Sequence, residues 1–437
     1  MRAVGAISLI LALFVASVGR ADSSEDGEIA AVQPSVAEAP DAGGDQPGAE
    51  APDADQSPAE DDAGEPLSER LHRYWEANFI DPEDGEFDAS QFLASRSGVL
   101  PAPIFLTEPT LGYGGGANLL FLQPRHEKGR EGYLRPDVTI VGGLMTENGT
   151  WAGFAGDLRH WLDGRVKTVV GGMKARLRLD FYGLGIDRIV GDRPLGYELD
   201  VNGARAGGQY RVPGTHFWIG GSYQFATVDA SFAQNLDLPL PDVLDLGFAS
   251  KKATLSGPIF RATYDTRNSI FAPDEGYYGQ VELATGFEAL GGSSSYQTLD
   301  VVNIAYFPLS ENLYVGFRSD FKRSFGDAPF YLKPALAFEG IPAMRYQGQS
   351  VLQGQGQISW RFWDRFSVVG FIGGGGAWNR GSRFREAKSV YAGGGGLRYD
   401  LARLFRLQYG LDYAYGPDGG TVYVVVGSAW KFPGSGL

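Results

Sequence analysis

The chain has 437 residues, with 63 glycines, 27 phenylalanines, 21 tyrosines, 8 tryptophans and no cysteine. The absence of cysteine excludes disulfides, thiolate metal sites and a lipid-modified cysteine, and four scattered histidines show no metal-ligand spacing. The formal net charge is −14, yet 14 acidic residues and no basic residue lie between positions 22 and 66. The remaining 38 acidic residues equal the 38 basic ones, so the body of the protein is charge-balanced and predicts no nucleic-acid partner.

Residues 1–21 have the pattern of a signal peptide for export. Arg2 supplies the positive end, residues 6–18 form an apolar run, and Gly19 and Ala21 are the small residues that precede a cleavage site. The alternative is a membrane anchor, but the apolar run is too short to span a bilayer.

Residues 22–66 are rich in Ala, Pro, Asp, Glu and Gly. Such a composition buries too little apolar surface to offset the entropy of ordering, so we expect an acidic disordered spacer. A partner-binding tail is the alternative interpretation.

Residues 67–102 are expected to form a periplasmic amphipathic helix and a lead-in to the next region. Leu67, Leu71, Trp75 and Phe79 fall on one helical stripe, and Ser68 is a candidate helix cap.

An acidic turn at residues 81–85 follows this helix and raises the question of a calcium loop. The register fails, because with Gly85 as the loop glycine the first and third ligand positions hold Ile80 and Pro82, which have no carboxylate. We therefore expect no metal at this turn.

From residue 103 the pattern changes to strict alternation. Leu177 and Leu179 share one face of their segment, while Arg176 and Arg178 share the other. Because apolar faces often end in aromatic residues, we expect apolar faces toward lipid and charged faces toward a water-filled lumen. The same alternation occurs in residues 312–323 and 403–416.

The alternating segments predict an all-β fold: a transmembrane antiparallel β-barrel over residues 103–432, followed by an extension at 433–437. Fifteen candidate strands are visible, and because closed bacterial barrels have an even number we expect 16, with one missed in the first half. The candidates are 104–121, 134–145, 150–161, 165–181, 195–211, 214–231, 250–265, 276–288, 295–308, 312–323, 351–363, 365–378, 387–400, 403–416 and 420–432.

One turn resembles a signature of the BamA/TamA-type outer-membrane proteins, also called bacterial surface antigens. In that signature an Asp-x-Arg opens a turn that a Pro and a Gly close. Asp265 and Arg267 match the opening, and Pro273 and Gly276 match the closure. An ordinary hairpin is the alternative.

A second resemblance is the family's long inward loop, whose arginine lies inside the barrel. Arg345 matches that arginine, and five candidate strands follow, as in the family. Gly373 stands where the family has the aspartate that faces this arginine. The resemblance therefore implies another carboxylate partner, with Asp320 and Asp412 as candidates from their inward-facing register, or a loosely held loop.

The end of the barrel resembles the assembly signal of outer-membrane proteins, in which a glycine precedes two spaced aromatic residues. Gly427, Trp430 and Phe432 match it, although five residues follow Phe432. A plain final strand is the alternative.

The resemblance implies an outer-membrane location in a Gram-negative bacterium, contact with outer-membrane lipid and dependence on the barrel-assembly machinery during biogenesis. Residues 22–100 lack the βαβ character of POTRA domains, which indicates a branch of the family without them. The implied function is insertion or translocation of protein or lipid. A passive porin-like channel is the alternative, and an adhesive surface protein ranks last because few long loops are visible.

No enzyme motif or cofactor-binding motif is present. The sequence lacks both the Gly-x-Ser-x-Gly hydrolase elbow and the P-loop. The glycine runs 373–376 and 393–396 lie within alternating strands, so they indicate bending or close packing rather than phosphate binding. The carboxylates of Asp157, Asp180 and Asp320 are interpreted as charge-balanced lumen lining rather than an acid–base pair.

Overall fold

The computed structural model describes most of the chain from residue 66 onward. The described residues are 66–94, 98–108, 110–123, 136–182, 195–232, 251–269, 271–428 and 430. The expected signal peptide, the spacer up to residue 65, Phe432 and the extension at 433–437 lie outside this set.

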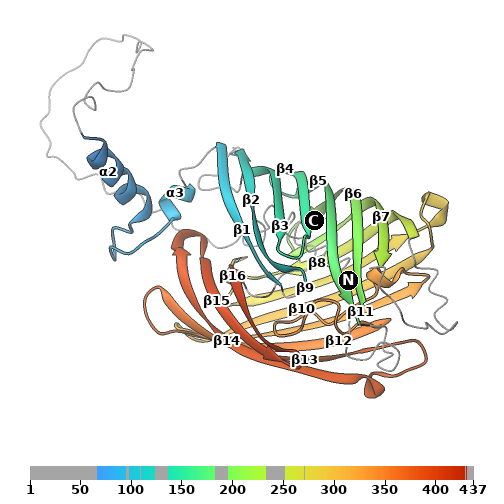
Figure 1. The fold of residues 1–437 in the computed structure, drawn as a ribbon. Coiled ribbons are helices and arrows are strands. Elements are labelled where there is room, and N and C mark those ends of the chain that lie inside the picture. The colour runs from blue at the N-terminus through green and yellow to red at the C-terminus, as the bar shows by residue number, and fades with distance from the viewer. Residues whose placement is uncertain are drawn as a thin grey trace, which may run out of the picture.

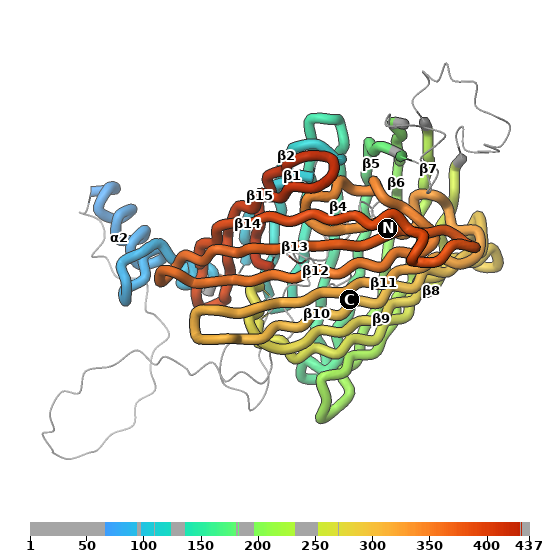
Figure 2. Tube along the Cα trace, turned by 90° about the horizontal axis from the view of Figure 1, so that it is seen from below, coloured from blue at the N-terminus to red at the C-terminus, as the bar shows by residue number. Residues whose placement is uncertain are grey.

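Sixteen antiparallel strands form one sheet in which every strand pairs with its neighbours in sequence. The sheet curls so that β15 and β16 return toward β1 and β2 and enclose a lumen (Figures 1 and 2). The strands are β1 (Gly98–Glu108), β2 (Gly112–Gln123), β3 (Asp137–Thr146), β4 (Trp151–Trp161), β5 (Val166–Phe181), β6 (Leu195–Arg211), β7 (Phe217–Phe232), β8 (Lys251–Asp265), β9 (Gly276–Gly286), β10 (Tyr296–Ser310), β11 (Leu313–Gly326), β12 (Ser350–Arg361), β13 (Phe366–Trp378), β14 (Lys388–Ala402), β15 (Leu407–Gly416) and β16 (Gly419–Val426).

The strand missed in sequence is the first one. The candidate strand at 104–121 is in fact the end of β1 and most of β2, joined by a tight turn in which the Leu111 amide donates to the Glu108 carbonyl. Gly112 follows with a φ of 82°, a conformation that favours glycine. Because this turn is so short, the two alternating runs look like one in the sequence.

We call the end of the barrel where β1 begins and β16 ends the terminal end, and the opposite end the loop end. Two helices precede β1 at the terminal end, α2 (Leu67–Phe79) and α3 (Ser90–Ala94). The expected cap at Ser68 is wrong, because the cap position is Pro66, two residues earlier, and no side chain caps the helix. Within the described part of the chain, no helix is long and apolar enough to cross a bilayer.

The expected orientation of the side chains is confirmed in β11 and β15. Phe317 and Tyr413 are exposed on the outer face, while Asp320 and Asp412 are buried on the inner face. Apolar residues therefore face lipid and charged residues face the lumen in these strands, as expected for a membrane barrel.

In β5 the expected orientation is wrong. Leu177 and Leu179 are buried on the inner face, whereas Arg176 and Arg178 lie on the outer face and pair with carboxylates of β6. The reason is that Leu177 and Leu179 belong to a hydrophobic cluster with the loop between β11 and β12, which lies inside the barrel. Because apolar residues of this loop fill the lumen beside β5, the inner face of β5 is apolar and its outer face is charged.

The same reversal applies to two of the three carboxylates interpreted as lumen lining. Asp157 and Asp180 share the outer-face register of their strands, alternating with buried Leu158 and Leu179. Asp157 pairs with Arg159 at 2.7 Å on that face. Only Asp320 faces inward.

This reversal predicts how β5 responds to truncation. Leu177 is 0% exposed, so Leu177→Ala should lower the free energy of unfolding by about 2–4 kcal/mol by leaving a cavity against the inward loop. Val170→Ala, on the outer face of the same strand at 59% exposure, should cost clearly less. Urea unfolding of the refolded barrel in micelles measures both, and equal losses would place Leu177 on the lipid face instead.

Candidate functional site

The candidate site is the interior of the barrel and the loop of residues 327–349 that fills part of it. This inward loop connects β11 to β12. Phe330, Tyr331 and Leu332 form a buried 3-10 turn within it, and the Phe330 ring packs edge-on against Tyr197 of β6 at 5.2 Å between centroids. The first part of the loop therefore covers the apolar inner wall that β3 to β6 present.

The second part of the inward loop packs against the opposite wall. Leu336, Phe338 and Ile341 form a buried cluster with inner-face residues of β12 and β14. A Cβ at Gly373 would lie 2.8 Å from the Phe338 ring, and one at Gly375 would lie 2.8 Å from Leu336. These glycines of β13 thus make room for the loop, which confirms the expected close packing in this run.

The inward loop also contacts both strands that border the gap in the sheet. The Ala343 amide donates to the Glu108 carboxylate of β1 at 3.0 Å, and the Thr110 hydroxyl donates to the Ala343 carbonyl at 3.1 Å. The Gly340 amide donates to the Tyr423 hydroxyl of β16 at 3.1 Å. The loop therefore bridges β1 and β16 from inside the barrel.

Arg345 is held at the loop end of the barrel. Its Nε donates to Asp418, in the turn between β15 and β16, at 3.0 Å, and the guanidinium lies over the Tyr182 ring at 4.2 Å. The side chain is 20% exposed. Arg345 is therefore paired with Asp418 and not with Asp320 or Asp412, the two expected partners.

Asp320 and Asp412 face the lumen, yet each already has its own cation. Asp320 accepts from Arg318 at 2.9 Å, and Asp412 accepts from Arg398 at 2.7 Å. Both expected pairings with Arg345 are therefore wrong. Both aspartates lie within strands, whereas Arg345 reaches the turn after β15.

The turn between β8 and β9 is built on a buried ion pair. Asp265 accepts from the backbone amide, Nε and Nη2 of Arg267, the last at 2.7 Å. The guanidinium also stacks over the Tyr278 ring at 4.5 Å. Gly276 has a φ of 102°, and a Cβ there would lie 2.3 Å from the Thr266 carbonyl, so only glycine fits. Pro273 lies in the same turn, where the Phe271 carbonyl would lie 3.1 Å from a Cβ at Gly427.

The chain leaves the sheet after Val426 rather than continuing as the expected strand to residue 432. Gly427 has a φ of 73°, and its amide donates to the Gln408 carbonyl at 2.6 Å. Trp430 is buried on the inner wall against Tyr306, with 5.6 Å between ring centroids. Of the three residues that resemble an assembly signal, Gly427 thus lies at the end of β16 and Trp430 inside the barrel, and Phe432 lies outside the described residues.

We call the junction between β1 and β16 the seam. These strands are the two ends of the hydrogen-bonded order, so no ladder joins them among the described strands. Across the seam, the Val424 amide donates to the Thr107 hydroxyl at 3.2 Å. The barrel is therefore nearly closed, with its weakest wall where the inward loop bridges the two strands.

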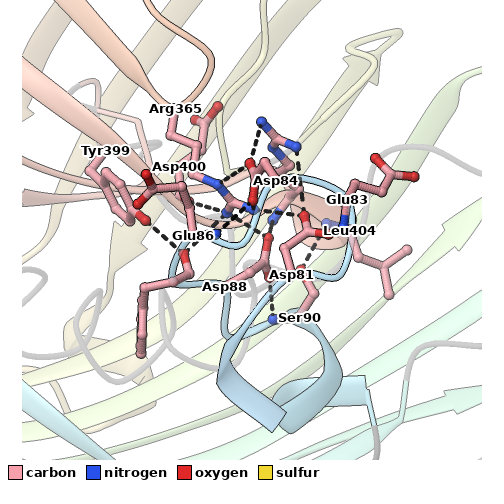
Figure 3. A network of polar contacts seen from close by, with 12 residues as sticks. Asp81, Glu83, Asp84, Glu86, Asp88, Ser90, Arg365, Tyr399, Asp400 and Leu404 are labelled. Carbon is pink, nitrogen blue, oxygen red and sulfur yellow. Dashed lines mark hydrogen bonds and ion pairs between the residues drawn. The ribbon is translucent and has the colours of Figure 1, made fainter. Parts of the chain in front are cut away.

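A cluster at the terminal end attaches the segment before the barrel to the strand turns (Figure 3). Arg365, between β12 and β13, donates to Asp81 at 2.6 Å, to Asp84 at 2.7 Å and to Asp88 at 2.8 Å. Arg365 is 2% exposed, and its fork also reaches the Phe87 carbonyl at 3.1 Å. We call Arg365 and its three aspartates the clamp.

The electrostatics of the clamp favour the charged forms. Hydrogen bonding from Arg365 lowers the pKa of Asp84 to about 2. Burial opposes ionisation of Asp88, but hydrogen bonds from Ser90 and Arg365 outweigh it and leave its pKa below the usual value. The carboxylates of the acidic turn thus hold an arginine. No group of three or more potential ligands is arranged for a metal within the described residues.

Sequence reasoning missed the clamp and Asp418. Asp81 and Asp84 drew notice only as possible calcium ligands, and nothing in the sequence linked them to Arg365, which lies about 280 positions away. An arginine in a short strand turn carries no periodic signal that could have predicted its partners.

Comparisons with known proteins agree with this architecture. A model of the Omp85 superfamily domain matches residues 219–339, from β7 into the inward loop. The fold resembles BamA from Haemophilus ducreyi lacking POTRA domains 1–3, with 10% identity, a TM-score of 0.55, and coverage of 82% of this chain and 77% of that one. It also resembles CdiB from Escherichia coli, with 13% identity, a TM-score of 0.52, and coverage of 75% of this chain and 61% of that one. A search of curated proteins found no match.

Because these identities are low, the solved structures show the fold alone. The protein is an outer-membrane β-barrel of a Gram-negative bacterium. It is similar in fold to the BamA and CdiB barrels, and its residues 219–339 match the Omp85 superfamily domain. In the described residues ahead of β1, the chain forms only α2, α3 and short connections.

The clamp makes a prediction about the segment before the barrel. Arg365→Ala leaves three carboxylates facing one another, so it should weaken docking of this segment by about 3 kcal/mol. Trypsin cleavage at Arg70 and Arg73 should accelerate. Arg361→Ala, a neighbouring arginine with one distant contact to Asp400 at 4.0 Å, is the matched control and should leave the cleavage rate unchanged.

The clamp should also open in acid. Because the pKa of Asp84 is lowered from 3.8 to about 2, its contribution is complete above about pH 4 and is lost as the pH falls toward 2. Pepsin cleavage of residues 66–94 should rise steeply across this interval. Asp84→Asn should give a flatter profile, and identical profiles for the two proteins would mean that Asp84 does not control docking.

Proposed function

We propose that the protein moves polypeptide into or across the outer membrane, with the inward loop as the element that opens the barrel. The observation that carries the proposal is the bridge from this loop to both sides of the seam, through Glu108 of β1 and Tyr423 of β16. Moving the loop would free the lumen and the weakest part of the wall at once. The likeness in fold to BamA and CdiB supports a role in insertion or secretion of protein.

The same proposal orients the barrel in the membrane. Outer-membrane barrels have short turns on the periplasmic side and longer loops outside. The long connection 327–349 lies at the loop end, and charged outer faces of β5 and β6 lie toward the same end. We therefore assign the loop end to the cell exterior, and the clamp and both helices to the periplasm.

Biogenesis follows from the position of the chain end. Trp430 is buried in the lumen, so a signal formed by Gly427, Trp430 and Phe432 is accessible to the barrel-assembly machinery only before the barrel is complete. We also propose lipid as a second substrate and a role of the BamA/TamA type. We assign no enzymatic activity.

Conductance in planar bilayers tests the proposal against a passive pore. A barrel of 16 strands encloses a channel unless something fills it. The intact protein should show low, flickering conductance, and replacing residues 329–348 by a short Gly/Ser linker should give larger, steadier openings. Large steady openings in the intact protein would favour the porin alternative.

Single substitutions refine this test. Arg345→Ala should destabilise the closed loop by about 1 kcal/mol, since the pair with Asp418 is partly exposed, and should increase flickering. Asp418→Asn should have the same effect, and the double variant should add little because the two residues act through one contact. Additive effects would show that Arg345 acts elsewhere.

A further inference from the structure

The edge of β1 at the seam has an unusual composition. Strand β1 contains Pro101 and Pro103, two residues apart, and both lie in the regular register with β2, opposite Leu119 and Ala117. Proline has no amide hydrogen and is found in sheets mainly at edges. The missing amide hydrogens of these prolines face either β2 or the seam. If they face the seam, they limit which strands can pair with β1 there.

The neighbouring bonds show that side. In an antiparallel pair, alternate residues bond to one neighbour, and the residues between them point to the other side. The Ile104 carbonyl lies on the β2 side, 3.2 Å from where a Cβ of Gly115 would stand, so even-numbered residues of β1 bond to β2. The backbone N–H and C=O groups of odd-numbered residues point to the seam. The amide hydrogens that Pro101 and Pro103 lack are therefore missing from the open edge, and the β1–β2 ladder stays intact.

Strand β16 covers only the other part of that edge. The contact between Val424 and Thr107 sets an antiparallel register in which Val426, the last residue of β16, falls beside Phe105. Beyond it Gly427 turns the chain toward the lumen. Residues 98–103 thus face the seam with no described strand beside them.

A strand added along residues 98–103 would meet an incomplete template. Pro101 and Pro103 occupy two successive seam-facing positions and offer the added strand no N–H donor there, so two of its carbonyl groups would stay unpaired. At bilayer depth no water replaces those bonds, and an unsatisfied backbone group there is costly. Prolines of this kind are a known protection of exposed strand edges.

We propose that Pro101 and Pro103 block strand addition along the terminal half of the β1 edge, so that a polypeptide substrate crosses this barrel without pairing as a strand with β1. The available edge is confined to residues 105–108, which β16 already adjoins. The block to strand addition follows from the register of β1 alone. The conclusion that a polypeptide substrate does not pair with β1 rests on the proposed function.

A peptide-binding assay tests the block without transport. The probe is a fluorescein-labelled peptide of residues 419–430 of this chain, added to the folded barrel in detergent micelles and followed by anisotropy. P101V/P103V should bind it at least tenfold more tightly than the unchanged protein. The matched control A102V keeps both prolines and changes a residue that bonds to β2, so its affinity should not change.

A photo-cross-linking residue at position 99 locates the peptide. It should label the peptide in P101V/P103V and not in the protein with both prolines. Equal affinity in the two proteins, or labelling from position 99 with both prolines present, would overturn the proposal. Heat-modifiable migration checks folding, and if the double variant does not fold, P101V and P103V alone should each give a partial gain. Large steady pores in the intact protein would overturn the transport function and leave this result unaffected.

Discussion

The packing of residues 327–349 inside the barrel is the interaction on which the rest of the structure depends. A 16-stranded barrel is too wide for its wall side chains to fill, so its interior must hold either water or another part of the chain. Here the inner wall of β3 to β6 is apolar and would be costly to hydrate, and the inward loop covers it. Gly373 and Gly375 on the opposite wall lack the side chains that would collide with Phe338 and Leu336.

The loop links the state of the lumen to the state of the wall. Its contacts with Glu108 and Tyr423 lie on the two sides of the seam, and Arg345 holds the turn that connects β15 to β16. The seam itself has little cohesion, because the described β1 and β16 share no ladder. Interior packing thus replaces the strand pairing that closes other parts of the sheet. At the other end of the barrel, the clamp fixes the preceding segment by charge rather than by apolar packing.

Alternation in the sequence predicted the all-β fold and most strand limits, because each strand must satisfy two different solvents on its two faces. It showed 15 strands, and the sixteenth came from the even number that closed bacterial barrels have. It could not predict the orientation of β5, since Leu177 faces inward only because a distant loop covers it. It placed Asp320 and Asp412 in the lumen correctly but gave them the wrong cation. The true partner of Arg345, Asp418, lies in a turn, where alternation cannot predict which way a side chain points. The contacts of Arg365 join residues far apart in the sequence and carry no local signal.

The inward loop lies inside the barrel and contacts both strands of the seam. The chain has no cysteine, so a pair introduced at Thr110 and Ala343 can be followed without background. The Thr110 hydroxyl donates to the Ala343 carbonyl at 3.1 Å, which places the two residues within reach of a short cross-link. Mild oxidation, or a short bifunctional reagent, applied to the protein in native outer membranes should join T110C to A343C rapidly and in high yield. Failure of the pair to cross-link in correctly folded barrels would contradict the account, because the loop would then not occupy the lumen beside β1.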